Sequence, residues 1–439
     1  MDAEGTELLR AERGTDGVLV GSSVRRRLGE LAARLGSRQD LAVRVTQPPG
    51  QAVLAFAADV PGYGWARWAP GPPPVDPVVA VDDQTLANGL LTVAADPATA
   101  TFSVDGLGGL GRLVDGGDIG DTYNWCPPDP EVEIGAPVSV TVEVTDAGPL
   151  RGRLVVVATY GWPRRAEHGR RGVELVDVEV TTTVELRAGE RFVRVTTAFD
   201  HRCRDHRLRA LFPLPAPATV SRAECAFAVV TRGLVAEGGP TEAALATFPS
   251  RRFVSAGGLT VVHEGLLEYE LVQRRADGAH ALALTLVRAT GMLSRGPMAT
   301  RALPAGPLLA MEGPQLQGPV AVRYAVHLGD VVDPYALADD VLVPLQTTSA
   351  GRGRRGAGNG PQSGQALSVT GAEVSALRRA GGGKREVRVF NPSPAPTTVT
   401  MAEQAGWLVD LRGHGLSPFR GSFELGPGRI ATALLETQP

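Results

Sequence analysis

The stretch VELVDVEVTTTVELRAGERFVRVTTAF, residues 173–199, decides the fold class of this chain. Apolar side chains alternate with polar or small ones on both sides of RAGE, residues 187–190, and a period of two is typical of β-strands. RAGE has the length of a hairpin loop and contains glycine. The two halves are therefore predicted to be antiparallel neighbours in a sheet.

The same alternation recurs along the chain, most clearly at residues 138–147, 153–162 and 321–328. With 54 glycines and 34 prolines available for turns, the pattern predicts a mostly β protein with large antiparallel sheets packed face to face. One segment differs, because residues 22–37 carry apolar side chains at helical spacing after two serines that could cap a helix. We expect one short N-terminal helix there.

Composition shifts divide the 439 residues into four predicted regions. A proline-rich stretch near residue 80 ends a small β domain with one helix, residues 1–84. A large β region, residues 85–346, follows, and the glycine-rich, almost apolar-free residues 347–365 are predicted to be a flexible linker. Residues 366–439 are predicted to form a small C-terminal β-sandwich.

Charge and cysteine content narrow the functional class. The net charge is -3, and the positive charge is arginine scattered singly, with Lys384 the only lysine, which argues against nucleic acid as a partner. No apolar run approaches the ~18 residues of a membrane-spanning helix, and the N-terminus has no signal-peptide pattern. Three cysteines without CxxC spacing fit a reducing compartment. A soluble, cytoplasmic protein is predicted.

The segment DGGDIGDTYNWCPPDP, residues 115–130, is the strongest candidate for recognition. It combines carboxylates, a phenol, an amide and an indole, and sugars need such polar partners together with an aromatic ring for their apolar face. A second interpretation stays open, in which the segment is a glycine-rich turn whose aspartates cap their own backbone.

Other clusters receive structural interpretations. Four side chains near residues 199–215 could bind a metal, namely Asp200, His201, Asp205 and His206. An ion-paired strand end is the preferred interpretation, because Arg207 and Arg209 alternate with Leu208. Glu268 and Glu270 are predicted to share one face of a strand, exposed to solvent.

Two further stretches contain glycine beside charged residues. GLGGLGRL, residues 106–113, lacks the lysine and the following helix of a phosphate-binding loop, so phosphate binding is rejected. Arg295 follows an apolar strand and precedes glycine and proline, where a guanidinium could bind vicinal hydroxyls or form an ordinary ion pair. Both alternatives for Arg295 stay open.

Several blocks, taken in order, resemble the region downstream of the catalytic barrel in glycoside hydrolase family 38, the α-mannosidases and mannosylglycerate hydrolases. They span roughly residues 55–435 and include DVPGYGWARW (59–68), VDGGDIGDTYNWCPP (114–128), FDHRCRDHRLRALFPLP (199–215), LTLVRATGMLSR (284–295) and VRVFNPSPAPTTV (387–399). The order and spacing of the blocks carry the resemblance more than any one block.

The resemblance implies a large β supersandwich similar to galactose mutarotase, flanked by smaller β-sandwich domains. In complete family members, a zinc ion, the aspartate nucleophile and the acid/base carboxylate belong to an α/β barrel. The family's zinc and nucleophile motifs have no counterpart in this sequence. Retaining glycoside cleavage requires two carboxylates about 5 Å apart, so no catalytic residue, metal site or cofactor is predicted for this chain itself.

The resemblance also implies that a tyrosine and an arginine of the β region approach the sugar, by position Tyr123 and Arg295. The complete set of predicted substrate-binding residues is Tyr123, Arg295, Asp118, Asp121 and Asn124. The leading hypothesis is the C-terminal β-sandwich portion of an α-mannosidase-like hydrolase, binding a mannose-containing carbohydrate and working with a separate catalytic barrel. The alternatives are a stand-alone carbohydrate-binding or scaffold protein, and a mutarotase-like enzyme using His206 and a glutamate.

Overall fold

The computed structural model describes residues 54–57, 59–68, 71–275, 277–348 and 361–436. The chain divides into two compact units, residues 1–55 with 345–362 and residues 56–344 with 363–439. All the elements below belong to the second unit. The predicted helix at residues 22–37 lies outside the described residues.

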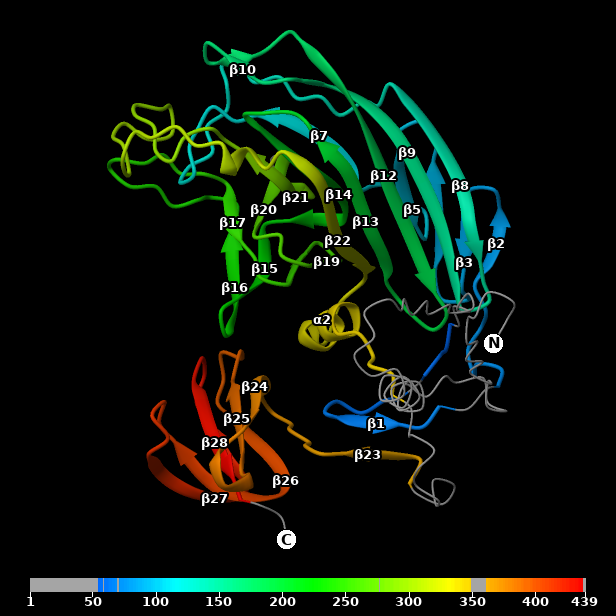
Figure 1. Cartoon of the computed structure of the whole chain (residues 1–439), viewed down its shortest axis with the longest axis vertical. Helices are drawn as coiled ribbons and strands as arrows, with labels where there is room; N and C mark the ends of the chain where they lie inside the picture. The colour runs from blue at the N-terminus through cyan, green and yellow to red at the C-terminus, as the bar shows by residue number, and fades with distance from the viewer. Residues whose placement is uncertain (1–53, 58, 69–70, 276, 349–360, 437–439) are drawn as a thin grey trace, which may run out of the picture. The chain divides into compact units, whose positions relative to one another are not determined.

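The largest element is a nine-stranded antiparallel sheet, which contains the hairpin at residues 173–199 (Figure 1). Its order is β16 (Ala228–Gly233), β15 (Val220–Cys225), β18 (Phe253–Ala256), β19 (Leu259–His263), β22 (Gly318–Leu328), β13 (Val193–His201), β12 (Leu175–Arg187), β9 (Arg151–Pro163) and β8 (Ser139–Ala147). The predicted antiparallel pairing of the hairpin is confirmed, with Val184 opposite Val195.

Two five-stranded antiparallel sheets complete the sandwich. One has the order β17 (Thr247–Pro249), β20 (Glu268–Arg275), β21 (Gly278–Ala289), β14 (His206–Ala218) and β7 (Arg112–Gly117). The other runs in sequence order through β2 (Val79–Asp82), β3 (Thr85–Ala87), β4 (Thr92–Asp96), β5 (Thr101–Val104) and β6 (Leu107–Leu110). The predicted domain boundary after residue 84 falls in the turn between β2 and β3.

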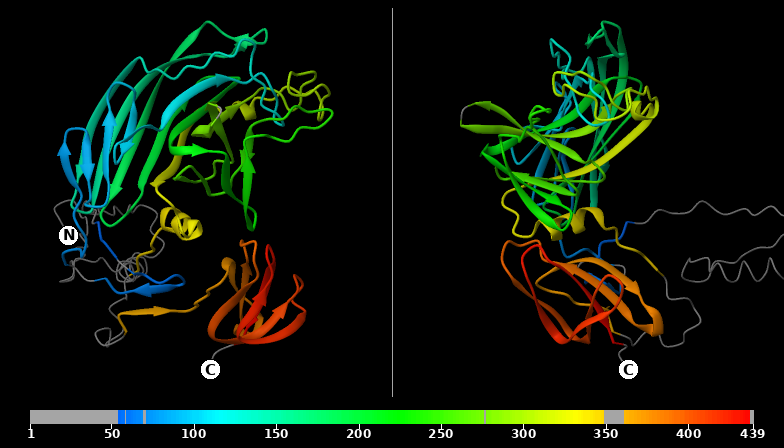
Figure 2. Two further views of the ribbon diagram at one scale, coloured as in Figure 1. Left: turned by 180° about the vertical axis from the view of Figure 1, so that it is seen from behind. Right: turned by 90° about the vertical axis from the view of Figure 1, so that its left-hand side faces the viewer.

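One hydrophobic core joins these sheets, and the alternating sequence pattern explains it. In β9 every second side chain is buried, from Leu154 to Trp162, and faces core residues such as Phe212 of β14 and Phe102 of β5. Figure 2 shows the facing layers from two further sides. The prediction of a mostly β fold with a large antiparallel sandwich is confirmed.

Residues 363–436 contain a separate five-stranded sheet with its own core around Val387, Met401 and Leu435. Its order is β24 (Glu373–Arg379), β25 (Arg385–Phe390), β28 (Ile430–Leu435), β26 (Thr397–Val409) and β27 (Gly415–Leu425). Two short pairs are also present, β1 (Gly64–Ala66) with β23 (Ser363–Gln365) and β10 (Ala166–Glu167) with β11 (Arg170–Arg171).

A single α-helix, α2 (Pro334–Leu342), occurs in the described part of the chain. Asp333 caps it by accepting the amides of Tyr335 and Ala336 at 3.0 Å each, and proline fits the first helical position. Two 3₁₀ turns, η1 (Gly313–Gln315) and η2 (Gly381–Gly383), complete the elements. No helix of the described residues is long and apolar enough to cross a membrane.

Candidate functional site

The recognition loop, residues 118–126, begins where β7 ends. It folds back on itself, because the Ile119 amide donates to the Cys126 carbonyl at 2.8 Å. Gly120 lies inside this turn, where a β-carbon would clash with the Asn124 carbonyl oxygen. Glycine is therefore required at this position by close backbone approach.

The two aspartates of the loop are completely buried and bind its backbone. Asp118 Oδ1 accepts the amides of Gly120 at 2.8 Å and Cys126 at 3.2 Å. Asp121 Oδ1 accepts the amides of the residues two and three positions later, both at 3.0 Å. The interpretation in which the aspartates cap their own backbone describes this geometry, and direct contact of either carboxylate with a ligand stays a prediction.

The second oxygen of Asp118 contacts an arginine of β21, which is separated from β7 by β14 in the sheet. Arg288 of β21 places Nε 2.7 Å from Asp118 Oδ2, and its side chain also donates to the Asp121 carbonyl. Burial raises the pKa of Asp118 to about 6, against the opposing effects of Arg288 and of the two backbone amides. Burial therefore raises the pKa of Asp118 by more than Arg288 and the two amides together lower it.

A second segment, residues 290–306, is bound to the recognition loop through Arg301, which is only 4% exposed. The Arg301 guanidinium forms an ion pair with Asp121 and donates to Asn124 Oδ1. It also donates to the carbonyls of Leu303 at 2.7 Å and Arg295 at 3.1 Å. One buried side chain thus holds both loops together.

Backbone contacts reinforce this junction. The Arg295 amide donates to Asp121 Oδ2 at 2.7 Å, the Thr122 hydroxyl to the Leu293 carbonyl at 2.6 Å, and the Thr290 hydroxyl to the Gly120 carbonyl at 2.9 Å. The structure therefore brings together the two loops that the sequence had indicated separately.

Tyr123 is presented to solvent by this junction, with 55% of its surface exposed. The Arg301 guanidinium carbon lies 5.8 Å from the centre of the Tyr123 ring. Asn124 is partly buried and its side-chain oxygen is occupied by Arg301. Arg295 is partly buried, and its Nε has no hydrogen-bond partner in the described part of the chain. Among the predicted site residues, Tyr123 is thus the one with an exposed side chain, whereas the unpartnered Nε of Arg295 is buried.

Behind the loop, Trp125 covers a buried polar network on the sheet. Its ring lies 4.8 Å from the Arg207 guanidinium carbon, and Arg207 bonds Glu268 and Glu270 at 2.9 Å each. The expected solvent exposure of the two glutamates is wrong, because both are partly buried in ion pairs, Glu270 also with Arg209. Their position on one face of β20 was predicted correctly.

The metal site that was weighed against an ion-paired strand end at residues 200–206 does not form. His201 and His206 hydrogen-bond each other directly, whereas Asp200 pairs with Arg202 and Asp205 accepts from the Gln315 amide group. No group of three or more His, Cys, Asp or Glu side chains that could hold a metal occurs among the described residues. Each of these four side chains therefore has a partner within the protein.

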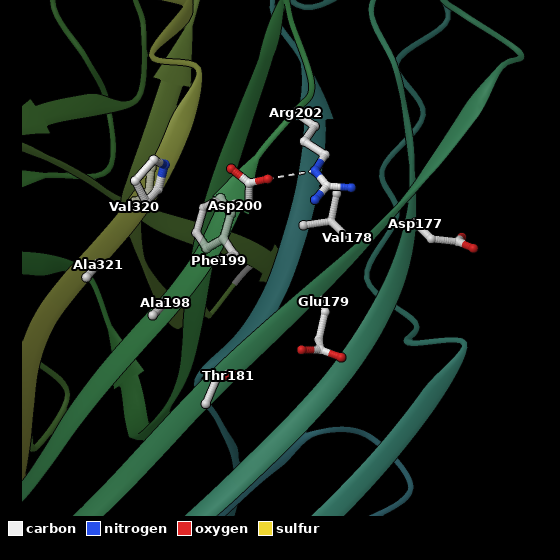
Figure 3. A pocket seen from close by; sticks show the side chains of 11 residues that line it. Asp177, Val178, Glu179, Thr181, Ala198, Phe199, Asp200, Arg202, Val320 and Ala321 are labelled. Carbon is white, nitrogen blue, oxygen red and sulfur yellow. Dashed lines mark hydrogen bonds and ion pairs between the residues drawn. The ribbon is translucent and has the colours of Figure 1, made fainter.

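A shallow pocket of about 540 Å³ lies elsewhere, on the face of the nine-stranded sheet opposite the core. Figure 3 shows the small side chains of Thr181, Ala198 and Ala321 along neighbouring strands, with Asp200 and Arg202 paired at one end. None of its lining residues belongs to the recognition loop or to residues 290–306. The hollow follows from small side chains on three adjacent strands.

Sequence reasoning missed two residues of the junction, Arg288 and Arg301. Arg288 lies at the end of β21, just before the second segment, and Arg301 lies within it, but their partners are more than 160 positions away along the chain. Strong carboxylate clustering in residues 115–130 was the only available signal that buried arginines would be needed nearby.

Comparisons with known proteins relate this architecture to sugar hydrolases, although no family model matches the chain. Over 205 residues, 42% of this chain and 22% of the relative, the sequence is 25% identical to a protein of Halalkalibacterium halodurans named "Putative mannosylglycerate hydrolase". The structure of an α-mannosidase from Enterococcus faecalis V583 matches with a TM-score of 0.69 and 21% identity, covering 82% of this chain and 43% of that one.

A second solved structure, a protein in glycosyl hydrolase family 38 from Enterococcus faecalis, matches with a TM-score of 0.67 and 22% identity. It covers 82% of this chain and 44% of that protein. The chain thus spans less than half the length of these relatives. The matches confirm the resemblance to family 38, and the structural ones show a shared fold.

Proposed function

We propose that this chain is the C-terminal β-sandwich portion of an α-mannosidase-like glycoside hydrolase and forms one wall of a mannoside-binding site. The observation that carries the proposal is the junction of the two loops, in which buried Arg301 and Asp121 hold Tyr123 exposed. The shared fold with family 38 proteins supports mannose-containing carbohydrates as the ligand class.

The chemistry of the exposed groups suits a sugar. The Tyr123 ring offers an aromatic face and a phenol, which can contact the apolar face and a hydroxyl of a pyranose. Arg295 is only partly buried, although its Nε is enclosed without a partner among the described residues, and a guanidinium can donate to two neighbouring hydroxyls. In this proposal Asp118, Asp121 and Asn124 position the loop that carries Tyr123.

Exposed leucines within residues 303–309 support a protein partner beside this wall. Leu303, Leu308 and Leu309 are 62%, 65% and 54% exposed, and the turn at Gly306 lies against the Tyr123 hydroxyl. Exposed apolar surface is typical of interaction sites. We propose that a catalytic barrel, carrying the zinc ion and the two carboxylates of hydrolysis, covers this surface.

The proposed setting is cytoplasmic mannose metabolism. All three cysteines, Cys126, Cys203 and Cys225, are free thiols in the structure. Free thiols fit a reducing compartment.

Titration of the purified chain with methyl α-mannoside tests the binding wall. We expect saturable binding in the millimolar range that Tyr123→Ala abolishes and Tyr63→Ala leaves unchanged, since Tyr63 is a comparably exposed tyrosine at 47%. Methyl α-galactoside is the control ligand. Absence of a sugar-dependent signal, or equal binding by Tyr123→Ala, contradicts the proposed wall.

A hydrolysis assay tests the proposal that the catalytic groups belong to the barrel and not to this chain. The purified chain is incubated with 4-nitrophenyl α-mannoside, with and without a zinc chelator. We expect no turnover above the uncatalysed rate, because the chemistry requires carboxylates that the proposal assigns to the barrel. Chelator-sensitive turnover by this chain alone would contradict it.

A further inference from the structure

Two buried histidines face each other at the base of the recognition loop. His201 ends β13 and His206 begins β14, both are 1% exposed, and their ring planes lie within 15° of each other with centroids 4.8 Å apart. Their Nε2 atoms lie 2.5 Å apart. The remaining nitrogens each meet an oxygen, Asp115 at His206 Nδ1 and the Leu316 carbonyl at His201 Nδ1, the latter at 2.8 Å.

The hydrogens in this chain of contacts can be counted. The row has three contacts: Asp115 with His206, His206 with His201, and His201 with the Leu316 carbonyl. The groups at its two ends, a carboxylate and a carbonyl, can only accept hydrogen bonds. Each contact needs one hydrogen, so three are required. Two neutral imidazoles supply only two hydrogens. Unless one contact opposes two lone pairs, the cluster contains one additional proton.

The surroundings favour a particular location for that proton. Arg171 of β11 forms an ion pair with Asp115, so a guanidinium faces the carboxylate on the side away from His206 Nδ1, which contacts the other oxygen. Burial and then the neighbouring His206 lower the pKa of His201 to about 4, so His201 is neutral. An imidazolium at His206 can donate to both Asp115 and His201, leaving His201 Nδ1 to donate to Leu316.

No other described group beside the pair competes for the proton. Burial raises the pKa of the nearby Cys203 thiol to about 12, so it remains neutral. Asp200 is directed into its pair with Arg202, and the rings around the histidines are those of Trp162 and Phe199. The charged and titratable groups around the pair are Asp115, Arg171, Asp200 and Cys203, with Arg164 further from it.

We propose that His201 and His206 form a buried proton-binding site, which retains one proton in the folded protein and thereby fastens the base of the recognition loop. His206 is opposite Gly117 at the end of β7, and the next amide, that of Asp118, donates to the Asp205 carbonyl at 2.9 Å. The proton thus joins β7, β13 and β14 where the loop leaves the sheet.

The sign of the pH dependence follows from proton counts. Unfolded histidines lose their protons near pH 6.5, so above that pH the unfolded pair holds none while the folded pair holds one. Stability then falls as pH rises, by up to about tenfold in the unfolding equilibrium per pH unit. Below pH 6.5 the unfolded pair holds two protons against one, so stability falls again as pH decreases.

Nitrogen NMR of the wild-type protein, labelled with ¹⁵N-histidine, detects the proton directly. At pH 8, more than one unit above the ordinary histidine pKa of about 6.5, we expect one of the seven histidines to show two protonated ring nitrogens. Its signal should be missing in His206→Gln. Seven neutral histidines at pH 8 would overturn the proposal, and this readout needs no variant.

Denaturant unfolding between pH 7 and 8 provides a second test. The stability advantage of wild type over His206→Gln is expected to shrink by up to about tenfold in the unfolding equilibrium across this range. His263→Gln is the matched control, since His263 is equally buried, is neutral and bonds Ser250 instead. Its difference from wild type should not change with pH in this range. An unchanging difference for His206→Gln would contradict the proton-binding site.

Discussion

Arg301 is the residue on which the junction of the two loops depends most, because its guanidinium compensates the buried Asp121 carboxylate. Arg301→Met is expected to destabilise the protein by about 3 kcal/mol, since it leaves a buried charge without its partner. Denaturant unfolding measures this loss. Arg323→Met is the control, because it breaks an exposed pair with Glu264 and should cost about 0.5 kcal/mol or less. Equal effects of the two substitutions would contradict the role of Arg301.

The buried carboxyl group of Asp118 predicts that stability depends on pH in the opposite direction to that expected of an ordinary ion-paired carboxylate. Its pKa is raised by burial from 3.8 to about 6, so between about pH 4 and 6 the folded protein holds a proton that the unfolded chain has lost. The stability contributed by Asp118 therefore decreases as pH rises through this window. Unfolding of wild type and Asp118→Asn across pH 4–8 measures the difference.

The expected difference between wild type and Asp118→Asn shrinks from pH 4 to 6 and is constant from pH 7 to 8. A difference that grows with pH in the lower window would mean that the ion pair with Arg288 outweighs burial.

For single residues, the sequence could indicate residues 115–130 as a recognition segment, but it could not show which of their side chains face a ligand and which cap the backbone. The chemistry of residues 115–130 singled out Tyr123, which the structure leaves exposed, together with Asp118 and Asp121, which it buries. Aspartates that cap a turn and aspartates that face a ligand have the same spacing in sequence. Only the positions of Arg288 and Arg301, which depend on tertiary structure, show that these two aspartates cap the turn.

Among the elements, the hairpin of β12 and β13 is held at its turn by a side chain from another sheet. Asn88 is 1% exposed, and its amide nitrogen donates to the carbonyls of Arg187 at 2.7 Å and Glu190 at 2.9 Å. Its oxygen accepts the amides of Leu90 and Leu91. This contact connects the five-stranded sheet of β2 to β6 with the nine-stranded sheet.

Asn88→Ala is expected to cost about 2 kcal/mol, because it leaves buried backbone groups without partners. Asn88→Asp is the matched variant, since it keeps the acceptor and places a second oxygen against two carbonyls. It should be at least as destabilising at pH 7 and recover at low pH as the carboxyl group becomes protonated. Thermal unfolding of both variants measures this, and wild-type stability of Asn88→Asp at pH 7 would contradict it.

The strands themselves were predictable because their signal is local. Alternation and the glycine-containing RAGE loop predicted β12 and β13, whose observed bounds are Leu175–Arg187 and Val193–His201. The exposure of Glu268 and Glu270 was not predictable, since their partner Arg207 lies about 60 positions earlier on a strand of the same sheet. Alternation shows which side chains share a face and does not show what covers that face.

For the whole molecule, the order of short blocks along the sequence indicated the large β-sandwich, and the solved structures of similar fold agree with it. The packing of β6 and β7 against β14, and of both five-stranded sheets against one nine-stranded sheet, depends on contacts distant in sequence. Such contacts leave no periodic signature, so the order of the strands in each sheet was not predicted from the sequence.

The central claim is that a mannoside contacts Tyr123 at the junction of the two loops. Nitration of the wild-type protein, quantified for each tyrosine by mass spectrometry with and without methyl α-mannoside, tests it in one molecule. Tyr63 and Tyr123 are the exposed tyrosines, and the other four are at most 4% exposed. We expect the sugar to slow nitration of Tyr123 and not of Tyr63. Equal nitration rates of Tyr123 with and without saturating sugar would contradict the claim.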